Sequence, residues 1–432
     1  MLDGILSQVK KGLFADKSDC YTVWNNSNWI RDSYVTIPDI THECSFTDEK
    51  GTILNCYVKD GKALVLVKDM KPFSFVTIRT VEAIEDHAIT LLYSNQVSTK
   101  FYNVSWNNYG HLTSIYDKEA DREILPVGKC GNVIQVFEDK PRCFDAWELE
   151  PTIDLKKEII EECKEIHIEE NALGIFVTFT WIYHKSEIKQ IMCLYSEKKR
   201  IDFKTEVEWQ ERQKIMKVAF PINIRAVDAR FDIQYGNISR PITRNNSWEV
   251  AKFEVVAHKW VDMWETGYGL ALLNDCKYGH DVNEDTIRLT LLKSAVDPDY
   301  SADLGHHEFT YSILPHTTEW YESNIEQEAF DLNNPLIAVT GASICKSDSL
   351  FTFGNEHIVV DCMKQAENTG DTVIRFHEYV GARGVVPITS SIPIKSWCEC
   401  DLMEQPMELF QEKPIQVTIK PYEIKTILVK FK

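Results

Sequence analysis

Several short motifs that would assign a chemistry directly are absent from this sequence of 432 residues. It has no paired C-x-x-C, which argues against the common structural zinc sites. It also lacks the G-x-S-x-G elbow, the G-x-G-x-x-G loop and the Walker loop, so a serine-hydrolase, dinucleotide or P-loop nucleotide site is not indicated. The twelve cysteines are scattered, apart from Cys398 and Cys400, and free thiols are expected.

Basic residues and long apolar runs are also scarce. The chain has 47 Lys and Arg against 66 Asp and Glu, a formal net charge of −19, and an acidic surface repels phosphate backbones, so no nucleic-acid partner is expected. No window approaches the roughly 20 apolar residues that a membrane span needs. Residues 1–10 lack the basic start and apolar core of a signal peptide. We therefore expect a cytoplasmic protein that does not associate with a membrane.

Alternating apolar and polar residues predict an all-β chain. Residues 201–209 place Ile, Phe, Thr, Val and Trp on one face and charged residues on the other, the pattern of a strand with one buried face. Together with 175–183, 188–195 and 218–224 they predict an antiparallel meander in a large sandwich. Hairpins are predicted at 57–67, around Asp60–Gly61, and at 101–116. Residues 156–170 contain good helix formers, but they lead into strands and favour β structure.

The same patterns suggest four segments. Leu2, Ile5, Val9 and Leu13 recur at helical spacing, which predicts a short helix within residues 1–17. A small β domain is expected over 18–90, the large sandwich over 91–345 and a C-terminal β domain over 346–432. Strands at 358–360, 373–376, 415–419 and 424–431 support the last of these.

The stretch from Arg230 to His316 is the densest in functional residue types. Tryptophan, histidine, arginine and acidic residues alternate there with strands that end in glycine, a mixture that suits a polar cleft with aromatic walls. Sugar rings stack on aromatic side chains while amides, acids and arginines bind the hydroxyls. For Trp248 and Trp260, packing in the core is an equally good interpretation.

Catalytic and metal-binding groups are harder to find. Glycoside cleavage needs two carboxylates across the scissile bond, and the candidates are Asp145, Glu148, Asp275 and Glu308, none of them in a spacing that makes a pair. Acids at turns are more often solvated or capping. His306 and His307 are adjacent on a strand and point to opposite faces, so they are not expected to bind one metal ion.

The chain resembles the C-terminal half of the glycoside hydrolase family 38 α-mannosidases, in their cytosolic and bacterial branch. The resemblance rests on ordered segments from Tyr21 onward: F-D-A-W-E at 144–148, V-A-F-P-I-N-I at 218–224, R-F-D-I-Q-Y-G at 230–236, A-L-L-N-D-C-K-Y-G-H at 271–280 and K-P-Y-E-I-K-T-I at 420–427. It implies a large antiparallel supersandwich, similar to galactose mutarotase, between smaller β-sandwich domains. The N-terminal helix would be the end of the family's helical bundle.

The resemblance also implies a chemistry for the whole enzyme. Family members are retaining, zinc-dependent exo-α-mannosidases that act in oligosaccharide breakdown, and their N-terminal barrel holds zinc, the nucleophile and an acid/base carboxylate. That barrel has no counterpart in this sequence. We therefore assign no catalytic residue, metal ligand or cofactor to this chain, and we expect the zinc in the missing catalytic domain.

What remains for this chain is the rim of a mannoside site, with roles in binding and positioning. The candidate rim residues are Asp145, Trp147, Arg240, Arg244, Trp248, His258, Trp260, Asp275, Tyr278, His280 and Arg288. The expected partners are an α-mannoside oligosaccharide and the catalytic barrel, and a homo-oligomer is possible. Two alternatives remain open: a free-standing carbohydrate-binding module, and a structural partner that docks on a separately encoded catalytic chain.

Overall fold

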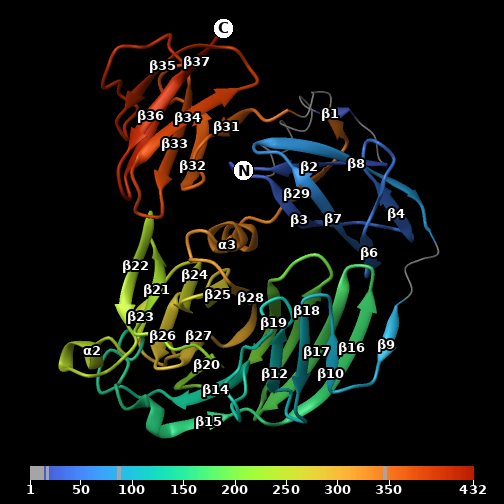
Figure 1. Cartoon of the computed structure of the whole chain (residues 1–432). Coiled ribbons are helices and arrows are strands. Elements are labelled where there is room, and N and C mark those ends of the chain that lie inside the picture. The colour runs from blue at the N-terminus through green and yellow to red at the C-terminus, as the bar shows by residue number, and fades with distance from the viewer. Residues whose placement is uncertain (1–13, 16–18, 85–88, 344–347) are drawn as a thin grey trace. The chain divides into compact units, whose positions relative to one another are not determined.

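The computed structural model describes residues 14–15, 19–84, 89–343 and 348–432, which are mostly antiparallel β structure (Figure 1). The prediction of an all-β fold with a large antiparallel sheet and smaller β domains is therefore confirmed. The helix predicted from Leu2, Ile5, Val9 and Leu13 lies outside the described residues. Within the described ranges, no helix has the length and apolar character that crossing a membrane requires.

Two compact units make up the fold. Unit 1 comprises residues 1–87, 235–237 and 334–432, and unit 2 comprises residues 88–234 and 238–333. The domain boundaries expected at 17, 90 and 345 stay predictions, and each unit is described below by itself.

A large antiparallel sheet runs through unit 2, and ten strands of it lie in the described residues. In spatial order they are β22 (Gly236–Pro241), β21 (Asp228–Ile233), β24 (Trp260–Glu265), β25 (Tyr268–Asn274), β28 (Gly305–His316), β19 (Ile201–Trp209), β18 (Ser186–Tyr195), β17 (Gly174–Tyr183), β16 (Cys163–Asn171) and β9 (Thr90–Leu92). Strand β16 confirms the choice of β structure for much of 156–170.

Unit 2 has two further sheets in the described part of the chain. The six-stranded one has the order β15 (Lys157–Ile159), β14 (Val133–Glu138), β20 (Lys214–Pro221), β27 (Thr286–Ser294), β26 (Gly279–Asn283) and β23 (Val255–Val256). The four-stranded one has the order β10 (Gln96–Ser98), β11 (Tyr102–Trp106), β12 (Leu112–Asp117) and β13 (Arg122–Glu123), and its β11–β12 pair confirms the hairpin predicted at 101–116.

The predicted meander is correct for three strands and wrong for the fourth. Strands β17, β18 and β19 are neighbours, and Lys204, Glu206 and Glu208 of β19 alternate with buried side chains as expected. Asp202, which was expected on the solvent face, is buried instead, because Arg200 pairs with it. After β19 the chain crosses to the six-stranded sheet, where β20 pairs with β14 and β27. Nearly all of β20 is buried, because both of its faces are covered, and a strand of this kind cannot continue a sheet that keeps one face in water.

Apolar side chains from all three sheets form one continuous core in unit 2, with Trp106, Phe179, Phe203 and Phe220 among the largest. A closed polar ring lies inside it. Tyr311 donates to the Asn132 side chain at 2.7 Å and accepts from the Gln190 amide at 2.7 Å. Asn132 donates in turn to the Gln190 oxygen at 2.7 Å. Every member is paired, as burial of polar groups requires.

Unit 1 contains two separate β sandwiches. Within the described residues, one N-terminal sheet has the order β29 (Ile337–Thr340), β2 (Cys20–Asn25), β8 (Ser74–Glu82), β4 (Cys44–Thr47) and β5 (Ile53–Leu54). The sheet that packs with it has the order β3 (Arg31–Ile37), β7 (Lys62–Met70) and β6 (Cys56–Lys59). A small additional pair is formed by β1 (Phe14–Ala15) and β30 (Ala342–Ser343). Asp60 and Gly61 both have positive φ, 50° and 73°, which is the geometry of a type I′ turn. The predicted hairpin at 57–67 is therefore confirmed.

The C-terminal sandwich of unit 1 packs two small sheets around one apolar core. Their orders in the described residues are β31 (Phe351–Phe353), β34 (Gly384–Ser390), β36 (Ile415–Ile419) and β32 (Ile358–Gln365), β33 (Thr372–Glu378), β37 (Ile424–Phe431), β35 (Ile394–Cys400). All four strands predicted after residue 346 are present.

The polar ring in the core of unit 2 generates a prediction. Replacing Tyr311 by Phe removes the hydroxyl and leaves the buried Asn132 oxygen without that donor, which costs about 1–3 kcal/mol. We expect the free energy of unfolding, measured in urea, to fall by that amount. Tyr300 is exposed, and Tyr300→Phe is the matched control, expected to be neutral. Equal stability of the two variants would contradict the role given to the ring.

Candidate functional site

A cluster of charged side chains lies on the face of the six-stranded sheet opposite the core of unit 2. It consists of Lys217, Glu254, Asp281, Arg288 and Asp154, and we call it the Lys217 cluster. Strand β27 shows how the sequence forms it: Leu289 and Leu291 enter the core, so Arg288 and Thr290 point to the other side. The register then places Thr290 opposite Lys217 and Asp281 opposite Arg288.

Every charge in this cluster has an opposite partner. The Lys217 ammonium lies 2.8 Å from the Asp281 Oδ2 atom and also bonds Glu254. The Arg288 guanidinium bonds Asp281 at 2.7 Å and holds Asp154 with two hydrogen bonds of 2.6 and 3.2 Å. Two cations thus share the Asp281 carboxylate between them.

These contacts keep the cluster ionised. Burial opposes the charge of Lys217, but Glu254 and Asp281 outweigh burial and raise the pKa of its ammonium. The Arg288 side chain lowers the pKa of Asp154 below its ordinary value. A general acid or base at neutral pH needs a pKa near 7, so Asp154 is better suited to holding Arg288 in place than to transferring a proton.

A cavity of about 350 Å³ lies beside Arg288 and is lined mainly by polar groups. Lys129, Gln135, Asn283 and Asp285 are among the lining residues, and Lys129 bonds Asp285 at 2.5 Å. The Gln135 amide oxygen is buried and has no hydrogen-bond partner among the described residues. Amide, carboxylate and ammonium groups around a small cavity can bind a ligand with several hydroxyl groups.

The structure brings only some of the predicted rim residues together. Arg288 is in the Lys217 cluster. His258 and Tyr278 lie next to each other, with ring centroids 5.4 Å apart. Arg240 stacks on Phe231 with its guanidinium 4.6 Å from the ring, and burial lowers the pKa of Arg240.

Other rim candidates have local structural contacts. Asp145 accepts the backbone N–H of Val296 at 2.6 Å, and Asp275 accepts that of Thr310 at 2.9 Å. Trp260 is buried and donates its indole N–H to Glu326 at 2.9 Å, which is the core arrangement expected of a buried tryptophan.

The exposed candidates are Trp147, Trp248 and Tyr278, whose exposed fractions are 71%, 80% and 52%. Trp248 lies on the short helix α2 (Ser247–Ala251), and Asn246 caps that helix by accepting the backbone N–H groups of residues 248 and 249. Arg244 is half-buried in the segment before α2. The rim roles of all eleven residues stay predictions.

Sequence reasoning missed most of the Lys217 cluster. Lys217 interrupts the apolar run I-M-K-V-A-F-P at 215–221, and a lysine inside a strand that is otherwise apolar could have suggested a buried, paired charge. Glu254 and Asp154 gave no such sign, because Glu254 lies in a bend before β23 and Asp154 lies on the short 3₁₀ helix η1 (Ile153–Lys156). Asp281 directly follows the rim candidate His280, but it meets Lys217 and Arg288 only through strand register.

The family resemblance assigns no zinc ligand to any position of this chain. Among the residues that the structure describes, no three His, Cys, Asp or Glu side chains are placed to hold a metal ion. His306 bonds two carboxylates, those of Glu208 and Glu308, while the neighbouring His307 bonds the Asp303 carbonyl. No step of a reaction is therefore assigned to a metal in this chain.

Comparison with known families identifies these domains. Residues 97–301 match the model "Glycosyl hydrolases family 38 C-terminal domain", and residues 357–427 match "Glycosyl hydrolases family 38 C-terminal beta sandwich domain". The chain belongs to glycosyl hydrolase family 38. It carries C-terminal domains of that family, as its sequence indicated.

Individual relatives agree with this assignment. Alpha-mannosidase G of Dictyostelium discoideum is 35% identical over 350 residues, which are 76% of this chain and 32% of that protein. Human Alpha-mannosidase 2C1 is 33% identical over 332 residues, 74% of this chain and 32% of that protein. The chain therefore spans about one third of the length of these relatives.

A solved structure shows the same fold. An alpha-mannosidase from Enterococcus faecalis V583 superposes with a TM-score of 0.78 over 100% of this chain and 58% of that chain, at 17% sequence identity. The likeness at this identity concerns the fold alone.

The Lys217 cluster yields a prediction for this family 38 chain. Lys217→Met leaves Glu254 without its buried cation and Asp281 with Arg288 alone, and breaking a buried pair in this way costs about 3–5 kcal/mol of unfolding free energy. The exposed Lys204 on β19 is the control, and Lys204→Met is expected to change stability little. Adding Glu254→Gln to Lys217→Met should recover part of the loss. Urea unfolding tests all three variants, and a neutral Lys217→Met would contradict the assignment.

His280 generates a pH-dependent prediction. It is fully buried, its Nδ1 lies 3.1 Å from the Tyr278 carbonyl oxygen, and burial lowers the pKa of its imidazole to about 4. Because the unfolded chain has a histidine pKa of about 6.5, it takes up the proton first as pH falls below that value. The contribution of His280 to the free energy of unfolding is thus fully present above about pH 6.5 and is lost as the pH falls toward about 4.

We expect the unfolding free energy to drop, between pH 7 and pH 4.5, by about 2–3 kcal/mol more in the native protein than in His280→Gln. Urea unfolding of both proteins at the two pH values measures this difference. His42, which is exposed, supplies the control variant His42→Gln, and this variant should retain the native pH dependence. Identical pH profiles for native protein and His280→Gln would refute the prediction.

Proposed function

We propose that this chain is the C-terminal β portion of a retaining, zinc-dependent exo-α-mannosidase that hydrolyses terminal α-mannosides in the cytoplasm. The supporting observation is the family match, which is confined to C-terminal domains, together with coverage of only 32% of relatives that carry the name alpha-mannosidase. On this proposal the zinc ion, the nucleophile and the acid/base carboxylate belong to a catalytic part outside this chain, and the chain alone does not hydrolyse mannosides.

The role proposed for unit 2 is to hold and shape one side of a mannoside site. The Lys217 cluster supports this role because its charges are fixed by ion pairs before any ligand arrives, and fixed groups position a ligand at little entropic cost. The polar cavity beside Arg288 supplies hydroxyl-binding groups. Trp147, Trp248 and Tyr278 supply exposed rings on which a sugar can stack.

A docking role without catalysis is the second candidate. It is favoured by large apolar side chains that unit 2 leaves open to solvent, which include Phe144, Trp147, Leu155 and Trp248. Exposed apolar groups of this size often mark a protein interface. On this alternative the chain binds a separately encoded catalytic chain and contributes only to its stability.

Activity measurements test the proposal. The full chain with zinc and an aryl α-mannoside should show no turnover, and turnover that a chelator abolishes would contradict the absence of catalytic groups. A chimera, in which this chain replaces the matching third of Alpha-mannosidase G, provides the experiment in which activity is expected. If the proposal holds, the chimera retains chelator-sensitive hydrolysis. A monodisperse, folded chimera without activity would argue against it.

The chimera also separates the two candidates. Arg288→Ala removes a group that lines the polar cavity. If unit 2 shapes the sugar site, this variant should raise KM or lower kcat/KM for the mannoside by about tenfold, an effect of roughly 1.4 kcal/mol. If the chain only docks, kcat/KM per folded molecule should stay unchanged. Arg212→Ala, at a site stacked on Tyr300, is the control and should leave kcat/KM unchanged in both cases.

A further inference from the structure

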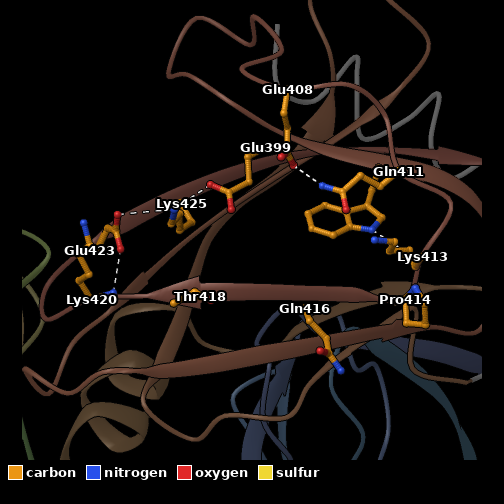
Figure 2. A pocket seen from close by; sticks show the side chains of 11 residues that line it. Glu399, Glu408, Gln411, Lys413, Pro414, Gln416, Thr418, Lys420, Glu423 and Lys425 are labelled. Carbon is orange, nitrogen blue, oxygen red and sulfur yellow. Dashed lines mark hydrogen bonds and ion pairs between the residues drawn. The ribbon is translucent and has the colours of Figure 1, made fainter.

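The C-terminal sandwich of unit 1 contains an open groove between two edge strands. Strand β35 is at the edge of one small sheet and β36 is at the edge of the other. A cavity of about 570 Å³ lies between them, with side chains of both strands on its walls (Figure 2). We call it the β36 groove. Its volume is within the range of pockets that bind small ligands.

Opposite charges balance in this groove. Glu399, Glu408 and Glu423 contribute three carboxylates, and Lys413, Lys420 and Lys425 contribute three ammonium groups. Figure 2 shows part of the internal pairing: Lys425 lies 2.7 Å from Glu399 and 3.6 Å from Glu423. Because the formal charges of the lining sum to zero, the groove favours neither an anion nor a cation.

Neutral hydrogen-bonding groups of the groove are available for a ligand. Gln416 and Thr418 are exposed on β36 and line the groove, and their side chains have no hydrogen-bond partner in the part of the chain that the structure describes. Gln411 is oriented by Glu408, to which its amide donates at 2.7 Å. An amide, a hydroxyl and an amide along one groove can bind successive hydroxyl groups.

The groove also has a rigid apolar element. Trp397 is almost fully buried, and its indole N–H donates to the Lys413 carbonyl at 2.9 Å. That hydrogen bond ties the segment before β36 to β35. The polar groups are therefore presented from fixed strands, which lowers the entropic cost of binding.

We propose that the β36 groove binds a short neutral oligosaccharide, as a second carbohydrate site in addition to the one proposed for unit 2. An extended peptide added to the free edge of β36 is less favoured, because Lys413, Pro414 and Lys420 border the five-residue strand. Lysine and proline at a strand edge oppose pairing with another chain. That the ligand is a neutral sugar is inferred from the side chains that line the groove. The choice of a mannoside as the first probe rests on the proposed function.

Calorimetric titration of the full chain tests this site. The probes are an α-linked mannobiose, cellobiose as another neutral disaccharide, digalacturonate as an anionic one, and an extended hexapeptide of alternating Thr and Val. We expect saturable binding of a neutral disaccharide and much weaker binding of digalacturonate. Gln416→Ala combined with Thr418→Ala should lower the affinity for the neutral sugar by about tenfold, since each lost hydrogen bond contributes about 0.5–1.5 kcal/mol.

Gln365→Ala is the matched control, because Gln365 is exposed on β32 in the same sandwich and does not line the groove. It should leave the affinity unchanged, and thermal unfolding should confirm that all variants fold. Binding of cellobiose but not mannobiose, with loss in the double variant, would support the groove and weaken the proposed mannosidase function. No neutral binding, binding unaffected by the double variant, or binding of the peptide alone would each overturn the inference.

Discussion

Covering both faces of the six-stranded sheet is the constraint on which the charge arrangement of unit 2 depends. One face is filled by the apolar core, so the alternation of each strand sends its remaining side chains to the other face. That face is covered too, and Lys217 is buried there. An ammonium group without a partner would cost several kcal/mol in such a place. Glu254 and Asp281 must therefore lie beside it, and Asp281 in turn positions Arg288 and Asp154.

The requirement that buried charges be paired also fixes the helix α3 (Ile325–Asn333) within unit 2. Arg200 holds Asp202 with two hydrogen bonds of 2.6 and 3.1 Å and reaches Glu328 on α3 at 2.9 Å. Lys198 bonds Asp331 on the same helix at 2.6 Å. Burial raises the pKa of Asp202, but Arg200 more than offsets that effect, and the pKa lies below its ordinary value. Ion pairs of this kind hold charged groups in one geometry.

Much of the fold could be predicted from local patterns. The Asp60–Gly61 turn and the alternation of β19 are each specified by a few neighbouring residues, and both predictions are correct except at Asp202, which is buried with Arg200. The assignment of 218–224 to the meander was wrong, because a strand buried on both faces has no alternation that would reveal its sheet. Choosing between the two sheets required the long-range pairing of β20 with β14 and β27.

The sequence by itself determined the family and the all-β class. These follow from ordered motifs and from periodicity, which act over short stretches of chain. Only the tertiary structure decided which residues meet. Trp260 is buried against Glu326 and Trp248 is exposed, although both are tryptophans in similar polar surroundings. Lys217 and Asp154 are 63 positions apart and are linked through Asp281, which bonds Lys217, and Arg288, which bonds both Asp281 and Asp154; strand register and burial bring them together, which no local pattern encodes.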